Sequence, residues 1–100
     1  MSIVKIKLPS WVAVAIDPKA KDWLTVEKES GENTTALELL MNFAKTNSGF
    51  RQAVFNPDSS VIIDQINVIL NDRLLTYQEI SELKLKDNDT IMLLPIYLGG

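Results

Sequence analysis

Apolar and polar residues alternate in two stretches near the start of the chain. In Ile3–Leu8 every second residue is aliphatic, and two of the intervening residues are lysines. In Asp22–Lys28 leucine and valine fall on one side, and polar residues and Trp23 fall on the other. A period of two predicts strands with one buried side. The first strand should end at Pro9, because proline cannot donate a ladder hydrogen bond.

The apolar period becomes helical after the turn-forming residues Ser30–Asn33. Four apolar residues have the spacing i, i+3, i+4 and i+7, which predicts a buried helix face. They are Leu37, Leu40, Met41 and Ala44. Thr35 and Glu38 have the spacing of a capping box, and Thr34 is an equally good cap. We therefore expect one main helix near Thr34 to Asn47, followed at once by a stop.

The second half of the chain returns to strands. We expect a strand at Ile66–Leu70, a turn at Asn71–Arg73 and a short return through Leu74 and the next leucine. Thr90–Leu94 is apolar on both faces, which is typical of a central strand, and it should end at Pro95.

The order strand, strand, helix, strand, strand predicts an α+β fold. We expect a mixed sheet of four or five strands, with the first and last strands adjacent, parallel and central. Loops are expected at Pro9–Lys21 and Asn56–Ser60, and a short turn at Leu83–Leu85. A single helix covers only one face of such a sheet, so the uncovered face is a place to look for binding.

Composition excludes several classes of protein. A chain of 100 residues corresponds to one domain, and a net charge of −3 argues against binding of nucleic acid. No apolar run approaches the roughly 18 residues of a membrane span, and we recognise no secretory leader, so a cytoplasmic protein is expected. The chain has no histidine and no cysteine, which removes the commonest nucleophile pairs and zinc ligand sets. We expect no metal, no bound cofactor and no enzymatic activity of its own.

Two of the four glycines are the last two residues, Gly99 and Gly100. Glycine has no Cβ, so a tail of this kind is thin and can enter another protein's active site. We therefore expect a domain over residues 1–94 and a flexible tail over residues 95–100.

Two segments resemble the small sulfur-carrier proteins of the β-grasp, ubiquitin-like superfold. Ile66–Leu74 is similar to their strand and turn, and Leu85–Pro95 with the final two glycines is similar to their closing segment. The chain is thereby identified as MoaD/ThiS-like, and is most similar to the MoaD-type small subunit of molybdopterin synthase. It departs from that pattern at Asn88, where the family usually has glycine, and at Ile96, where a second proline is common. It also departs in Pro9–Lys21, which lacks the usual Arg-Glu pair.

The resemblance implies a mechanism and partners. An E1-like enzyme of the MoeB/ThiF type would use ATP to adenylate the carboxylate of Gly100, and a sulfur donor protein would convert the adenylate into a thiocarboxylate. The sulfur would serve molybdopterin synthesis through the MoaE-type large subunit. Leu74 and Leu94 correspond to positions used against the adenylating enzyme, and Arg73 is a candidate to pair with an acidic partner. Both leucines can equally be core residues, Arg73 can be merely solvated, and Trp11 can anchor a partner or cap the core.

Three other functions fit the same residues. The chain can be a sulfur carrier for thiamin or for tRNA thiolation. It can be a protein modifier whose Gly100 forms an isopeptide bond to a lysine, or a ubiquitin-like module that only binds. The sequence by itself does not separate these functions from the first.

Overall fold

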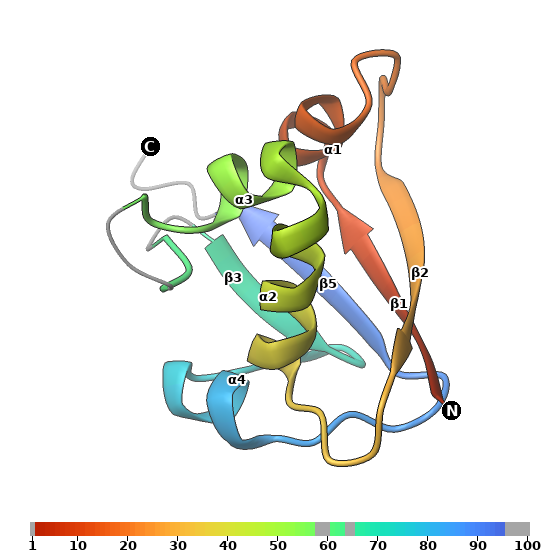
Figure 1. Ribbon diagram of the computed structural model, residues 1–100, viewed down its shortest axis with the longest axis vertical. Helices are drawn as coiled ribbons and strands as arrows, with labels where there is room; N and C mark the ends of the chain where they lie inside the picture. The colour runs from red at the N-terminus through yellow and green to blue at the C-terminus, as the bar shows by residue number, and fades with distance from the viewer. Residues whose placement is uncertain (1, 58–60, 64–65, 96–100) are drawn as a thin grey trace.

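The computed structural model describes residues 2–57, 61–63 and 66–95. Five strands form one sheet in the order β2-β1-β5-β3-β4, and α2 lies across one face of it (Figure 1). The elements along the chain are β1 (Ser2–Leu8), α1 (Ser10–Ile16), β2 (Leu24–Ser30), α2 (Ala36–Thr46), α3 (Ser48–Val54), β3 (Ile66–Leu70), β4 (Arg73–Leu74), α4 (Tyr77–Glu82) and β5 (Thr90–Pro95). The predicted α+β, β-grasp fold is confirmed.

The last strand is central, as its two apolar faces predicted. β5 pairs parallel with β1 and antiparallel with β3, whereas β2 pairs antiparallel with β1. Because β1 and β5 run in the same direction, the chain leaves β5 at the same end of the sheet at which α1 follows β1 (Figure 1). We call this end of the molecule the tail end.

The core lies between the sheet and the helices. The aliphatic side chains of β1 and β5 that point toward α2 are completely buried, namely Val4, Ile6, Leu8, Ile91 and Leu93. Each such side chain stabilises the fold by about 1.5–3 kcal/mol relative to an exposed position. The alternation in the first strand therefore predicted the correct buried side.

The buried face of α2 is centred differently from the prediction. Leu40 and Ala44 are buried as expected, but Leu37 and Met41 are only half-buried at the margin of the core. The buried face instead consists of Ala36, Leu39, Leu40, Phe43 and Ala44. Phe43 was missed because its partner is Phe50 of α3, with ring centroids 4.3 Å apart. A stack between two helices leaves no periodic signal in either sequence.

Three short helices were not predicted. α1 occupies part of the segment expected to be a loop, and α3 begins where the main helix was expected to stop. Asn47 ends α2 and also caps α3, because its side-chain oxygen accepts a hydrogen bond from the N–H of Phe50. α4 starts with a capping box formed by Thr76 and Glu79, in addition to the box predicted for α2. These helices have six or seven residues, which is too few to display a full apolar period.

Left-handed backbone occurs at the tight turns. Asn71 and Asp72, between β3 and β4, have φ angles of 48° and 70°. Asn88 has a φ of 69°, so asparagine adopts the conformation for which glycine is usual in the resembling family. The fold accommodates this departure without a glycine.

The chain beyond β5 lies outside the described residues. The expectations for the tail, including its flexibility and its glycines, concern residues 96–100 and stay predictions. Pro95 itself is the last residue of β5 and pairs with Ile66. Within the described part of the chain, no helix has the length and apolar character needed to cross a membrane.

Candidate functional site

One face of the sheet carries a row of apolar side chains that point away from the helices. Paired residues on neighbouring strands share a face, and the pairs run from Leu74 to Ile69, from Ile69 to Met92, and from Met92 to Lys7. Lys7 lies between two buried residues of β1, so this row faces the opposite side from the core. We call this uncovered side of the sheet the open face.

Four apolar side chains form a strip on the open face: Ile69, Leu74, Met92 and Leu94. Leu74 is 58% exposed, and the other three are half-buried. Leu94 follows Met92 by two residues, which places it on the same face and closer to the tail end. The two leucines that the sequence indicated therefore lie on one surface, and the core interpretation does not hold for Leu74.

The strip borders a polar half of the open face. Lys5 pairs with Glu27 of β2, and Lys7 pairs with Thr25. A shallow hollow of about 240 Å³ lies where the two halves meet, lined by Lys7, Ile69, Asn71, Asp72, Thr90 and Met92. A partner docked here would meet aliphatic side chains over β3 and β5 and charged side chains over β1 and β2.

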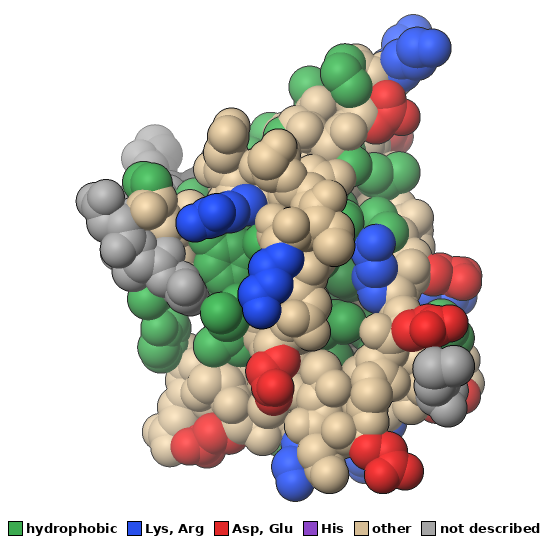
Figure 2. Space-filling model, viewed as in Figure 1, with side chains coloured by type: hydrophobic (Ala, Val, Ile, Leu, Met, Phe, Trp, Pro, Cys, Tyr) green, Lys and Arg blue, Asp and Glu red, His purple; other side chains and the backbone are tan. Residues whose placement is uncertain are grey.

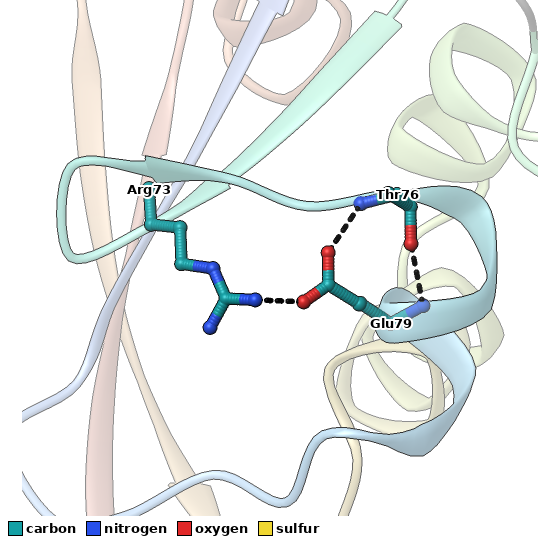
Figure 3. A network of polar contacts seen from close by, with 3 residues as sticks. All are labelled: Arg73, Thr76 and Glu79. Atoms are coloured by element: carbon teal, nitrogen blue, oxygen red, sulfur yellow. Dashed lines mark hydrogen bonds and ion pairs between the residues drawn. The ribbon is translucent and has the colours of Figure 1, made fainter.

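Arg73 does not belong to this strip. It pairs with Leu70, whose side chain packs against the core, so Arg73 points to the helix side of the sheet. There its guanidinium forms an ion pair with Glu79 of α4 (Figure 3). The structure thus separates Arg73 from Leu74 and Leu94, although the guanidinium stays largely exposed and accessible to a partner.

The carboxylate of Glu79 is held in its charged form. It accepts a hydrogen bond from the backbone N–H of Thr76, and it faces Arg73 (Figure 3). The Thr76 N–H and then the Arg73 guanidinium lower the pKa of Glu79 below its ordinary value, and desolvation acts in the opposite direction. This network fixes the start of α4. Because its pKa is lowered, the carboxylate of Glu79 is a weaker base than that of an ordinary glutamate.

A second polar network holds the start of β5 in place. The amide of Asn71 donates to the Oδ1 of Asp89 at 2.8 Å and accepts from the N–H of Thr90 at 2.9 Å. Asp89, which is only 9% exposed, also accepts from the N–H of Lys86 at 2.7 Å. These bonds join the β3–β4 turn to β5 and so set the relative positions of the strands that carry the strip.

The described residues contain no cluster of three or more histidine, cysteine, aspartate or glutamate side chains that could hold a metal ion. Among the predicted site residues, Gly99 and Gly100 lie outside the described part of the chain. Ile69 and Met92 were missed as surface residues. Their signal was present, since a strand with two apolar faces must place one of them away from the core.

The fold and the open face define a class of protein. A mixed sheet of five strands in the order β2-β1-β5-β3-β4, with its main helix on one face, is the β-grasp, ubiquitin-like architecture. The ThiS family model matches residues 8–100. The chain belongs to the ThiS family, among the β-grasp sulfur carriers and small modifiers.

Solved structures with the same fold span nearly the whole chain. SAMP1 from Haloferax volcanii has a TM-score of 0.75 at 20% identity, with 99% of this chain and 100% of that chain covered. CysO of Mycobacterium tuberculosis has a TM-score of 0.68 at 17% identity, covering 94% and 99%. A putative molybdopterin converting factor subunit 1 from Pyrococcus furiosus has a TM-score of 0.63 at 19% identity, covering 97% and 100%. No protein with a curated description matches the sequence significantly.

Proposed function

We propose that the chain is a sulfur carrier whose reacting group is the carboxylate of Gly100. An E1-like enzyme of the MoeB/ThiF type would bind the domain and present ATP to this carboxylate. A carboxylate oxygen attacks the α-phosphorus of ATP, pyrophosphate leaves, and an acyl-adenylate forms. Hydrosulfide delivered by a donor protein then attacks the carbonyl carbon, and AMP leaves with the electron pair of the acyl–oxygen bond, which gives a C-terminal thiocarboxylate. This sequence needs no catalytic side chain of the carrier itself.

The observation that carries the proposal is the family match, which runs through Gly100. Two features of the described residues support it. The central strand β5 runs to the tail end of the sheet, and two of the four side chains of the open-face strip, Met92 and Leu94, lie on this strand. The chain also lacks histidine and cysteine, which suits a protein that supplies a substrate rather than catalysis.

For the product we propose molybdopterin, with a MoaE-type large subunit as the acceptor of sulfur and the cytoplasm as the place of reaction. The fold shared with the putative molybdopterin converting factor subunit 1 supports this choice. A second function is favoured by the fold shared with SAMP1, which is described as a small archaeal modifier protein. A modifier would undergo the same adenylation but would end in an isopeptide bond between Gly100 and a lysine.

Adenylation is tested by ATP–pyrophosphate exchange with the E1-like enzyme of the same organism. The full chain should support exchange, and a variant without Gly99 and Gly100 should support none. We expect the same melting temperature for the two, because the glycines follow β5, the last strand of the sheet, by several residues in the sequence. Undiminished exchange without the glycines would refute the mechanism. In that assay Gly31→Ala is the matched control, since it alters a glycine far from the tail.

The product is tested by the intact mass of the protein purified from its own cells. Replacement of one oxygen by sulfur at Gly100 supports the carrier function. A branched peptide that joins Gly100 to a lysine supports the modifier function. Molybdopterin is tested separately, by adding the thiocarboxylate form and a MoaE-type subunit to the sulfur-free precursor. If no molybdopterin forms in that assay, molybdopterin is not the product, and the proposal of a sulfur carrier is unaffected.

A further inference from the structure

Three large apolar side chains are exposed at the tail end of the molecule. They are Trp11 at 39%, Val14 at 46% and Trp23 at 46%. Trp11 and Val14 lie on α1, which directly follows β1, and Trp23 directly precedes β2. Leu8 at the end of β1 pairs with Leu24 at the start of β2, so both segments meet at the same end of the sheet. We call these three side chains the tail-end patch.

The exposure of this patch is not explained by the packing of α1. The helix buries Val12 and Ala13 completely, and Trp11 and Val14, three residues apart, share the opposite side. Trp11 and Trp23 are the only tryptophans of the chain, and both keep a large exposed fraction. Figure 2 shows hydrophobic side chains at the surface over α1 and the segment that joins it to β2. Large apolar side chains exposed at the same end of a domain are candidates for an interaction surface.

The length of chain between the end of β5 and Gly100 limits where a partner can bind. β5 ends at Pro95, and Gly100 is the fifth residue after it. Five extended residues span at most about 17 Å. An active site that holds Gly100 must therefore lie within about 17 Å of the end of β5. Whatever enzyme takes the tail must place its surface against this end of the domain.

The tail-end patch falls within the footprint of such a partner. β1 is the neighbour of β5, β2 is the neighbour of β1, and strands are spaced about 4.8 Å apart. The start of β2 is thus about 10 Å from the end of β5, measured across the sheet. A standard interface covers about 800 Å² on each partner, which corresponds to a disc of roughly 16 Å radius. The start of β2, which Trp23 directly precedes, is within this radius of the end of β5, and α1 follows β1, the strand between them.

We propose that Trp11, Val14 and Trp23 form a second anchor for the enzyme that activates Gly100, beside the open-face strip. This inference rests on the proposed function. The charged residues around the patch are of both signs and all exposed, namely Asp17, Lys19, Lys21 and Asp22. Because these charges are mixed, the patch is complementary to an apolar recess on the enzyme rather than to a surface of one charge. Tryptophan is among the residues that most often dominate binding at such a centre.

The test compares Trp11→Ala, Trp23→Ala and the double variant with Tyr77→Ala in the pyrophosphate-exchange assay. Tyr77 is the matched control. It is an aromatic residue that is 63% exposed, and it lies on α4, away from α1 (Figure 1). The double variant should raise the KM for the carrier about tenfold or more, with kcat unchanged, because the contact acts equally before and during adenylation. Tyr77→Ala should leave both constants unchanged.

A second measurement needs no substitution. The wild-type chain is labelled with 5-fluorotryptophan, so its two fluorine resonances report Trp11 and Trp23 alone. Both resonances should shift or broaden when the unlabelled activating enzyme is added. Resonances that stay unchanged while the enzyme binds would overturn the inference, even if the alanine variants fail to fold.

The remaining outcomes are equally decisive. If the wild-type chain supports exchange and the double variant behaves like Tyr77→Ala, the second anchor is refuted while the proposed function stands. If sedimentation shows a dimer that the double variant abolishes, the patch serves a second copy of the chain and the inference is wrong. If the wild-type chain supports no exchange, the proposed function fails and the inference fails with it.

Discussion

The contact between α1 and α3 makes a sharp prediction about Gly49. A Cβ at this position would lie 1.9 Å from the carbonyl oxygen of Ala15 and 2.8 Å from its carbonyl carbon. Both are backbone atoms of α1, so no side-chain rotation relieves the overlap. Gly49→Ala should therefore push the two helices apart by about 1 Å and loosen the interior that they share.

Two opposing effects decide the sign of the change. Gly49 lies inside α3, where alanine would ordinarily stabilise the helix by up to about 1 kcal/mol. Overpacking of a dense interior costs about 1–3 kcal/mol, and this contact is at the severe end of that range. We expect a net loss of about 1–2 kcal/mol in the free energy of unfolding. For a domain of this size the melting temperature should fall by roughly 5–15 °C.

Gly31 provides the control. A Cβ at Gly31 would meet only the Oγ1 of Thr34, at 3.5 Å, which is an ordinary contact. Gly31→Ala should leave stability unchanged or raise it by up to about 1 kcal/mol. Thermal and urea unfolding, followed by circular dichroism and by tryptophan fluorescence, measure both variants. If Gly49→Ala proves as stable as Gly31→Ala, α1 does not pack on α3 as described.

Three further predictions concern the open face and the two polar networks. Leu74→Asp should leave the domain folded, because the side chain is 58% exposed, yet weaken binding of the activating enzyme about tenfold. Arg73→Ala should weaken this binding by less than about fivefold, because an exposed ion pair contributes little. Calorimetric titration measures both variants. Equal effects would contradict the role of the open-face strip in binding the enzyme. Asn71→Ala should lower the free energy of unfolding by about 1–3 kcal/mol, because buried Asp89 loses a donor; a urea midpoint equal to that of the wild type would contradict this. The pKa of Glu79 is lowered in the folded state, so its charge contributes stability above the ordinary glutamate range, and that contribution is lost as the pH falls through the folded pKa. The difference in urea midpoint between wild type and Glu79→Gln should be present at neutral pH and vanish in acid, and a difference independent of pH would refute the role of the ion pair.

Local patterns in the sequence determined the elements that depend on a segment's own periodicity. β1 and β5 were predicted with their correct strand order because alternation and apolar content are properties of the strand itself. The capping box of Thr35 and Glu38 located the start of α2, because both halves of that interaction lie within one helical turn. The family, too, was recognised from segments of sequence near the C-terminus.

Only the tertiary structure decided which of two similar residues serves a surface. Leu74 and Leu75 are adjacent and identical in type, yet Leu74 is 58% exposed and Leu75 is 5% exposed. Their difference follows from the pairing of Leu74 with Ile69, which turns one leucine outward and the next inward. The partner of Arg73 was equally undetermined, because Glu79 reaches it only after α4 has packed beside the sheet.

The tail-end patch shows the same limit on a larger scale. α1 is too short to be stable alone, and it forms because it packs against α3, which is distant in the sequence. Its tryptophan, the start of β2 and the exit of the tail meet at one end because β1 and β5, the first and last strands, run parallel. The order and apolar content of the elements had predicted that β1 and β5 are adjacent and parallel. Which side chains lie at the tail end depended also on α1, a helix that no local pattern of the sequence predicted.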